Sequence, residues 1–219
     1  MKVLVVSPHP DDETLGAGGT LIKLKKNGHN IFWLNVTDMK KEYGWPDEKI
    51  NHRKKQIKDI ISFFHFDGFY NLELPPAKLS SLNEEQIITN IRSVFEEIKP
   101  EWLIIPGQYD AHSDHHIVYN CCMACTKAFR APYIKRISTM EIVSETEFGF
   151  QEHKFSPNLF IDISEELEEK LEALKIYDTE IETPPFPRSI ENVKALATYR
   201  GSCCMCKYAE AFQMIKQIE

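Results

Sequence analysis

The sequence has no uninterrupted run of about 18 apolar residues, so it predicts no membrane-spanning helix. It also lacks an excess of positive charge, because 26 Lys and Arg residues stand against 33 Asp and Glu residues, a net charge of −7. Affinity for nucleic acids comes largely from neutralised phosphates, so this balance argues against a nucleic-acid-binding protein. Internal repeats, low-complexity tracts and convincing linkers are also missing, which disfavours repeat arrays and disordered segments.

A secretory signal is not expected either. The first apolar run, Val3–Val6, is ended by Pro8 and His9, far too early for the apolar part of a signal peptide. We therefore expect a cytoplasmic protein, whose thiols are normally reduced.

The six cysteines form two groups that could supply thiolates to a structural zinc or iron–sulfur site. The first group falls in a predicted helix and lacks the turn that zinc knuckles use. Free cysteine behaves as a small buried apolar side chain, so we favour a packing role. The two groups are Cys121, Cys122 and Cys125, and Cys203, Cys204 and Cys206.

The composition, 42% apolar and 27% charged, and the length of 219 residues predict one globular domain, residues 1–219. Residues 1–130 alternate buried strands with amphipathic helices. This alternation predicts an α/β fold, a Rossmann-like open and mostly parallel sheet with helices on both faces. The expected strands are 3–6, 31–36, 70–74 and 102–105, and the expected helices 15–26, 47–64, 83–99 and 114–129.

Residues 131–219 predict a C-terminal α+β extension. Strands are expected at 136–143 and 159–163, and helices at 164–177 and from Ser189 onward. The last segment, 209–218, is expected to be a short terminal helix.

Two polar clusters follow predicted strands, where open α/β sheets bind ligands. The segment 7–13 follows the first strand and the segment 110–116 follows the fourth. His9 and Asp12, three residues apart in a turn stiffened by prolines, can supply two ligands of a catalytic zinc site. The second cluster offers histidines for a third ligand. Two histidines and one aspartate suit zinc, or ferrous iron in a more open geometry, and Asp11 beside them could act as a general base.

Two plainer interpretations remain. Acids favour helix N-termini, so Asp11 and Asp12 could simply begin the next helix, but this does not explain the prolines around His9 or the second cluster. The stretch Gly16-Ala17-Gly18-Gly19 suggests a dinucleotide-binding loop, yet acids fill the strand-to-helix turn and would repel a pyrophosphate. We expect these glycines to let the helix pack closely on the sheet.

The two clusters resemble a known family. The stretch Pro8-His9-Pro10-Asp11-Asp12-Glu13, with glycines after it, resembles the opening motif of the PIG-L/LmbE-like zinc-dependent N-deacetylases. His112-Ser113-Asp114-His115 resembles the second motif of that family, His-x-Asp-His. Arg53 is similar to the family's substrate-binding arginine, and the segments 199–201 and 208–212 resemble a tail of many bacterial members.

The resemblance implies a role for each matching residue. One Zn²⁺ per chain, or Fe²⁺, would be held by His9, Asp12 and His115. Asp11 matches the general base that activates the attacking water. His112, protonated, would stabilise the tetrahedral oxyanion and protonate the departing amine, while Asp114 would orient His112 and keep it charged. Arg53 would hold hydroxyls or a phosphate of the sugar.

The resemblance also implies the activity: a hydrolase that removes the acetyl group from an N-acetylated amino sugar and releases acetate. The substrate would be an N-acetylglucosamine-like unit on an aglycone or nucleotide, and a homo-oligomer is compatible with the sequence. Residues 1–130 would form the metal-bearing core, and residues 131–219 would shape the substrate mouth. The alternatives are a metal-dependent hydrolase of another amide or ester bond, and a non-catalytic nucleotide-binding module.

Overall fold

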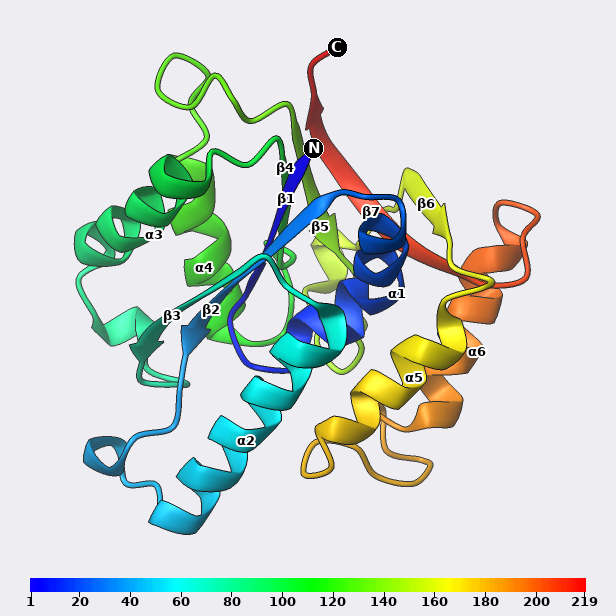
Figure 1. The fold of residues 1–219 in the computed structure, drawn as a ribbon, viewed down its shortest axis with the longest axis horizontal. Coiled ribbons are helices and arrows are strands. Elements are labelled where there is room, and N and C mark those ends of the chain that lie inside the picture. The colour runs from blue at the N-terminus through cyan, green and yellow to red at the C-terminus, as the bar shows by residue number, and fades with distance from the viewer.

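The computed structural model describes residues 1–219, apart from the side chain of Gln151. One seven-stranded sheet runs through the molecule in the order β3-β2-β1-β4-β5-β7-β6 (Figure 1). The first five strands of that order are parallel, and β7 pairs antiparallel with both β5 and β6. The strands are β1 Lys2–Ser7, β2 Asn30–Thr37, β3 Gly68–Leu74, β4 Trp102–Ile105, β5 Arg136–Met140, β6 Leu159–Asp162 and β7 Ala209–Gln217.

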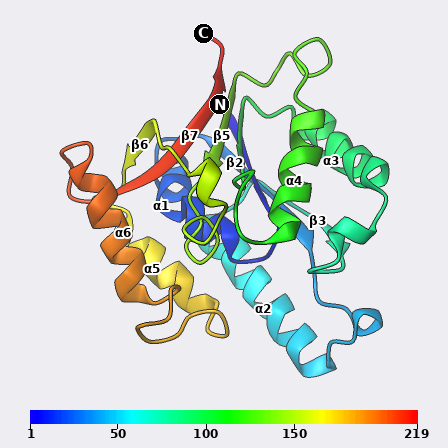
Figure 2. The same cartoon turned by 180° about the vertical axis from the view of Figure 1, so that it is seen from behind.

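Helices cover both faces of this sheet, which confirms the predicted α/β fold. Figures 1 and 2 show α3 and α4 on one face and α1, α2, α5 and α6 on the other. The continuous apolar run in β1 serves both layers, because Val3 and Val5 join one core and Leu4 and Val6 the other. The helices are α1 Asp12–Lys26, α2 Asp47–Phe64, α3 Glu84–Ile98, α4 Ser113–Ala124, α5 Leu167–Ile176 and α6 Ile190–Ser202.

Glycines bring α1 close to its neighbours. A Cβ added at Gly16 would lie 2.8 Å from the Met140 side chain in β5, and one at Gly19 would lie 2.8 Å from Ile163. The expectation that this glycine stretch serves packing is therefore confirmed. A buried ion pair, Lys170 Nζ to Glu210 Oε1 at 2.6 Å, also ties α1 to α5 and β7. Glu210 accepts the backbone N–H groups of Gly19 and Thr20 in the middle of α1.

The predicted terminal helix at 209–218 is wrong, because this segment is strand β7. Its residues Ala209, Glu210 and Ala211 favour helices, but the segment fills the gap between β5 and β6 and hydrogen-bonds to both. Pairing on two sides outweighs an intrinsic preference of a few tenths of a kcal/mol per residue, on the order of typical propensity differences. The fourth predicted helix is also shorter than expected and ends at Ala124.

The two cysteine groups have different environments. Cys121, Cys122 and Cys125 are buried in the core between α3, α4 and the sheet, as the packing interpretation predicts. For Cys203 and Cys204 that interpretation is wrong, because both are exposed at the end of α6. Among the described residues, no helix is both long enough and apolar enough to span a bilayer.

Candidate metal centre

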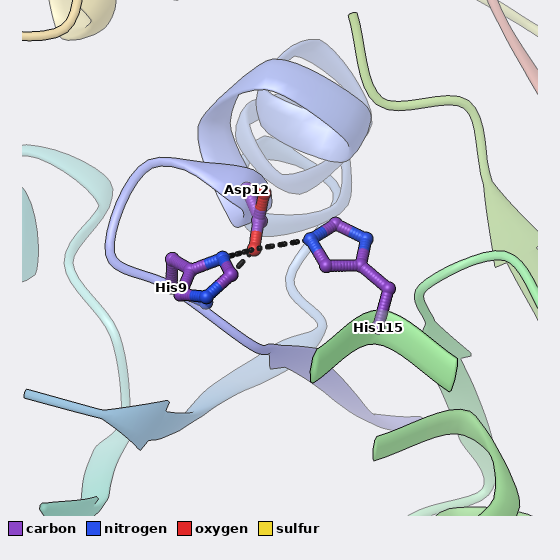
Figure 3. A group of neighbouring side chains, drawn as sticks. All are labelled: His9, Asp12 and His115. Carbon is purple, nitrogen blue, oxygen red and sulfur yellow. Dashed lines mark hydrogen bonds and ion pairs between the residues drawn. The ribbon is translucent and has the colours of Figure 1, made fainter. Parts of the chain in front are cut away.

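The two predicted clusters meet at one edge of the sheet. Strands β1 and β4 are neighbours and run in the same direction, so their carboxyl ends lie side by side. The loop after β1 carries His9, Asp12 is the first residue of α1, and α4, which follows β4, carries His115. Figure 3 shows the Asp12 carboxylate between the two imidazoles. His9, Asp12 and His115 form a group whose ligand atoms all lie within 4.8 Å of one another.

The loop after β1 folds back on itself to aim its side chains. The His9 backbone N–H donates to Asp12 Oδ2 at 2.8 Å, which fixes the three-residue offset. Asp11 caps α1 with a φ of 139°, a conformation that costs a non-glycine residue on the order of 1–3 kcal/mol. The buried Glu13 helps to hold that conformation, because its Oε2 accepts the Asp11 N–H and its Oε1 accepts the Tyr177 hydroxyl. Burial raises the pKa of Glu13 to about 7.

His115 leaves one nitrogen free. Its ring is fully buried, and its Nδ1 donates to Asp110 Oδ2 at 2.8 Å. In the neutral imidazole, that bond puts the proton on Nδ1 and leaves the lone pair on Nε2 for a metal. Without a metal, burial opposes protonation of His115, but the carboxylates of Asp12 and Asp110 raise its pKa well above its usual range. Nε2 is buried and lies among the few buried side-chain polar atoms for which the described residues provide no hydrogen-bond partner. A histidine whose other nitrogen is fixed by a carboxylate is the usual arrangement of a metal ligand.

The spacing of the three ligand atoms fits a metal ion. Asp12 Oδ2 lies 3.4 Å from His115 Nε2 and 3.5 Å from His9 Nδ1. Ligands about 2.0–2.2 Å from a tetrahedral zinc ion would stand roughly 3.3–3.6 Å apart.

The Asp12 carboxylate and the two histidines attract one another even without an ion. Burial opposes ionisation of Asp12, but His115 and His9 lower its pKa, and the carboxylates in turn raise the pKa of His9 to about 9 against the effect of its burial.

The Asp114 carboxylate lies closer to His9 than to His112. His9 Nε2 donates to Asp114 Oδ2 at 3.1 Å, so His9 also has a carboxylate behind it and turns Nδ1 toward Asp12. The same carboxylate accepts the backbone N–H groups of Ala77 and Leu79. Asp114 and His9 belong to a second group of possible metal ligands with His112, but these hydrogen bonds already occupy the carboxylate.

His112 packs edge-on against His9, with ring centroids 4.5 Å apart. It caps α4, and its Nδ1 accepts the Asp114 backbone N–H at 3.0 Å, which leaves Nε2–H as the donor toward the cavity. The Asp114 carboxylate lies 4.0 Å from His112 Nδ1. Burial and the nearby His9 lower the pKa of His112, so this structure favours the neutral imidazole rather than the imidazolium that the resemblance implies.

A cavity of about 270 Å³ opens beside the ligands, and the predicted base and arginine both line it. Burial, and then the charge of Asp12, raise the pKa of Asp11 well above its usual range. Arg53 projects from α2, where only 5% of it is exposed, and donates to the Pro10 carbonyl at 2.9 Å. The structure therefore brings together all seven side chains predicted for the site: His9, Asp11, Asp12, Arg53, His112, Asp114 and His115.

Sequence reasoning missed several side chains of this cavity. Asp38 directly follows β2, so the strand-end rule that found His9 could have found it. Glu145 lies two residues beyond the predicted strand 136–143, so the same rule could have found it, whereas Glu180 and Arg188 come from loops with no such signal. Asp110 lies in the second cluster, but the sequence pattern indicates no role for it, although its carboxylate orients His115.

Three relatives show what the chain is similar to. The diacetylchitobiose deacetylase of Thermococcus kodakarensis is 25% identical over 234 residues, which cover 99% of this chain and 84% of that protein. A probable N-acetyl-alpha-D-glucosaminyl L-malate deacetylase 2 of Bacillus cereus is 27% identical over 190 residues, 82% of this chain and 84% of the relative. The crystal structure of a conserved protein of Thermus thermophilus superimposes with a TM-score of 0.79 at 25% identity, over 99% of this chain and 96% of the other.

The first motif, the second motif and Arg53 all lie within one family match. The model of GlcNAc-PI de-N-acetylase (PIG-L) matches residues 4–126, which is more than half of the sequence. The chain therefore belongs to the PIG-L family.

Proposed function

We propose that the protein is a zinc-dependent N-deacetylase that hydrolyses the acetamide of an N-acetylated amino sugar and releases acetate. The observation that carries this proposal is the buried, unpartnered His115 Nε2 facing Asp12, with Asp11 and His112 at the same cavity. A protein that only bound metal would need neither of these two neighbours. The deacetylases among the relatives support the same reaction class and the same class of substrate, N-acetylated sugars.

The metal is held by His9, Asp12 and His115 in this proposal. When bound, zinc supplies a Lewis acid for the acetyl carbonyl and lowers the pKa of water at the site. Asp110 and Asp114 fix the two imidazoles so that each presents an unprotonated nitrogen to the ion. Ferrous iron suits the same three ligands, so the metal identity is part of the proposal.

Asp11 takes the proton of the attacking water. Its carboxyl lines the cavity beside Asp12, and burial makes it a stronger base than a surface aspartate. Asp12 belongs to the ligand group and Asp11 does not, although both line the cavity, so adjacent residues serve as ligand and base. The proton then goes to the amine nitrogen, which leaves as the C–N bond breaks.

His112 stabilises the developing negative charge on the acetyl oxygen. Its Nδ1 is held by the backbone of α4, so Nε2–H donates into the cavity. A single well-placed donor of this kind contributes roughly 3–4 kcal/mol to the transition state. Arg53, at the cavity wall, orients the sugar through its hydroxyls.

Acetate release with measured metal content tests this proposal. Protein loaded with one zinc per chain is expected to release acetate from N-acetylglucosamine glycosides. His115→Ala should lose both metal affinity and activity, whereas His29→Ala, at the far end of α1, should keep both. A folded His115→Ala variant that binds zinc tightly would refute the ligand assignment, and a zinc-loaded protein that acts only on esters would favour the alternative hydrolase.

The setting of this reaction is also part of the proposal. We infer a cytoplasmic protein of one domain that acts on a small-molecule substrate, and the exposed thiols of Cys203 and Cys204 are compatible with a reducing compartment. Homo-oligomerisation stays a prediction that sedimentation analysis would test.

A further inference from the structure

The walls of the cavity carry more acid than base. Besides Asp11 and Asp12, the carboxyl groups of Asp38, Glu145 and Glu180 line it, against the guanidinium groups of Arg53 and Arg188. Lys49 stacks on Trp45 with its ammonium 5.7 Å from the ring centroid, but it does not itself line the cavity. Recognition of an anionic group by this cavity would therefore fall to the two arginines.

Both arginines are already bound to one acid, Glu180. Arg53 Nη2 donates to Glu180 Oε1, and Arg53 Nη1 donates to the Pro10 carbonyl at 2.9 Å. Arg188 Nη2 donates to Glu180 Oε2 at 3.4 Å, and Arg188 Nε donates to the Glu180 carbonyl at 3.1 Å. The remaining Arg188 nitrogen, Nη1, donates to Ser144 Oγ at 3.3 Å. The Glu180 carboxylate thus lies between two guanidinium groups and occupies them.

This arrangement has a consequence for the substrate. Carboxylates and phosphates are bound tightly where a guanidinium can present two free N–H groups side by side. In this cavity the Glu180 carboxylate takes the place of such an anion, so its negative charge would repel an anionic aglycone. Hydroxyl groups of a neutral sugar both donate and accept, so they can bond to the carboxylates and to the remaining N–H groups.

We propose, on the basis of the deacetylase function above, that Glu180 is a specificity-determining residue that selects substrates with an uncharged aglycone, such as a second sugar. Glu180 bonds to both arginines that would otherwise bind an acidic aglycone, and its negative charge offsets part of their positive charge. It excludes glycosides of hydroxy acids, sugar phosphates and nucleotide sugars by charge, not by size.

A matched pair of substrates tests this inference. The carboxymethyl glycoside of N-acetylglucosamine and its methyl ester differ by one negative charge at the aglycone. Because like charges brought together at an interface cost several kcal/mol, zinc-loaded wild-type protein should show a kcat/KM at least about tenfold higher for the ester. The difference should lie mainly in KM, since the aglycone is remote from the acetyl group. Calorimetric titration of the metal-free protein with both glycosides should give the same order of affinity.

Substitution of Glu180 should remove the preference for the ester. Glu180→Gln keeps the shape but removes the negative charge and one of the two acceptor oxygens. The ratio of kcat/KM for the ester to kcat/KM for the acid should therefore fall at least about tenfold, through a lower KM for the acid. Glu182→Gln, an exposed residue of the same loop, is the control and should leave the ratio unchanged. If Glu180→Gln does not fold, Arg188→Met gives a second test, because it removes one cation and should raise the preference for the ester.

Each outcome has a distinct meaning. Equal kcat/KM values for the two glycosides in the wild type, or an unchanged ratio in folded Glu180→Gln, would overturn the role of Glu180 and leave the deacetylase proposal standing. A wild-type preference for the acid would do the same. Failure to release acetate from either glycoside, at full zinc occupancy, would overturn the deacetylase function and this inference with it.

Discussion

The carboxylate of Asp110 should control metal affinity without touching the metal. Its Oδ2 accepts His115 Nδ1–H at 2.8 Å and the Gly107 N–H at 3.0 Å, and its Oδ1 accepts the Thr146 hydroxyl at 2.9 Å. Asp110→Asn keeps an oxygen for His115 but removes the charge that makes Nε2 a better ligand. Loss of such a partner costs roughly 10–100-fold in metal affinity. This corresponds to about 1.4–2.8 kcal/mol of binding free energy.

The more severe change, Asp110→Ala, separates binding from folding. It leaves the Gly107 and His115 N–H groups without an acceptor, at about 1–3 kcal/mol for each buried donor, so the free energy of unfolding should also fall. Gly107→Ala should displace the same carboxylate, because an added Cβ would overlap Asp110 Oδ1. It should weaken metal binding in the same direction as Asp110→Asn.

Competition between the metal-free protein and a chromophoric zinc chelator measures the dissociation constant, and urea unfolding checks the fold. Asp67→Asn is the matched control, because Asp67 also accepts a backbone N–H and a side-chain N–H, from Ile31 and Asn30, but lies at the opposite end of β2 from the site. The control should change zinc affinity by less than about twofold, well below the effect of losing a carboxylate that orients a metal-binding histidine. A folded Asp110→Asn variant with wild-type zinc affinity would refute the idea that this carboxylate orients His115.

Three further predictions follow from single contacts. Asp11→Asn should keep zinc bound but reduce kcat by about 10²–10⁴-fold, which is the usual contribution of a general base. An acetate-release assay with metal analysis measures both quantities, and turnover near the wild-type rate would exclude Asp11 as the base. Glu210→Ala should lower the free energy of unfolding in urea by about 3–5 kcal/mol, because it leaves the buried Lys170 ammonium without its ionic partner, with only the Leu15 carbonyl to accept from it. Glu172→Ala breaks an exposed ion pair and should cost less than about 1 kcal/mol, so equal losses in the two variants would contradict the buried-pair argument. Burial raises the pKa of the Cys121 thiol to about 12 and that of the Cys125 thiol to about 11. At pH 8 these two thiols should therefore react with an aromatic disulfide reagent only after unfolding. Raising the pH toward 11 should speed their reaction, because more of each thiol is then ionised. Rapid reaction at pH 8 should be confined to the exposed thiols of Cys203 and Cys204, and rapid modification of all six in the folded protein would show that the α4 packing is wrong.

Much of the fold could be predicted because its signals are local. The helix 47–64 and the strand 102–105 have the boundaries expected from the sequence, since apolar periodicity and flanking prolines mark them. Segment 209–217 could not be assigned this way, because its helical preference is overruled by the two strands that it joins. Likewise, nothing in the order of residues distinguishes the buried cysteines of α4 from the exposed ones after α6.

The candidate ligands could be found for a similar reason. Parallel neighbouring strands bring their carboxyl ends to one edge, so clusters that follow β1 and β4 must meet if those strands pair. The hydrogen bonds that give those residues their chemistry were not predictable. The resemblance implies that Asp114 orients His112, but the Asp114 carboxylate accepts its histidine hydrogen bond from His9.

The sequence by itself determined which residues could bind a metal and act as a base, because His9, Asp11, Asp12 and His115 lie in two motifs at strand ends. Only the tertiary structure decided which nitrogen of each histidine is free, because that depends on Asp110 and Asp114 behind the rings. It also decided the charge of the cavity wall. The loop that carries Glu180 is remote in sequence from Arg53, and side chains distant along the chain become partners only when the packing of the helices brings them together.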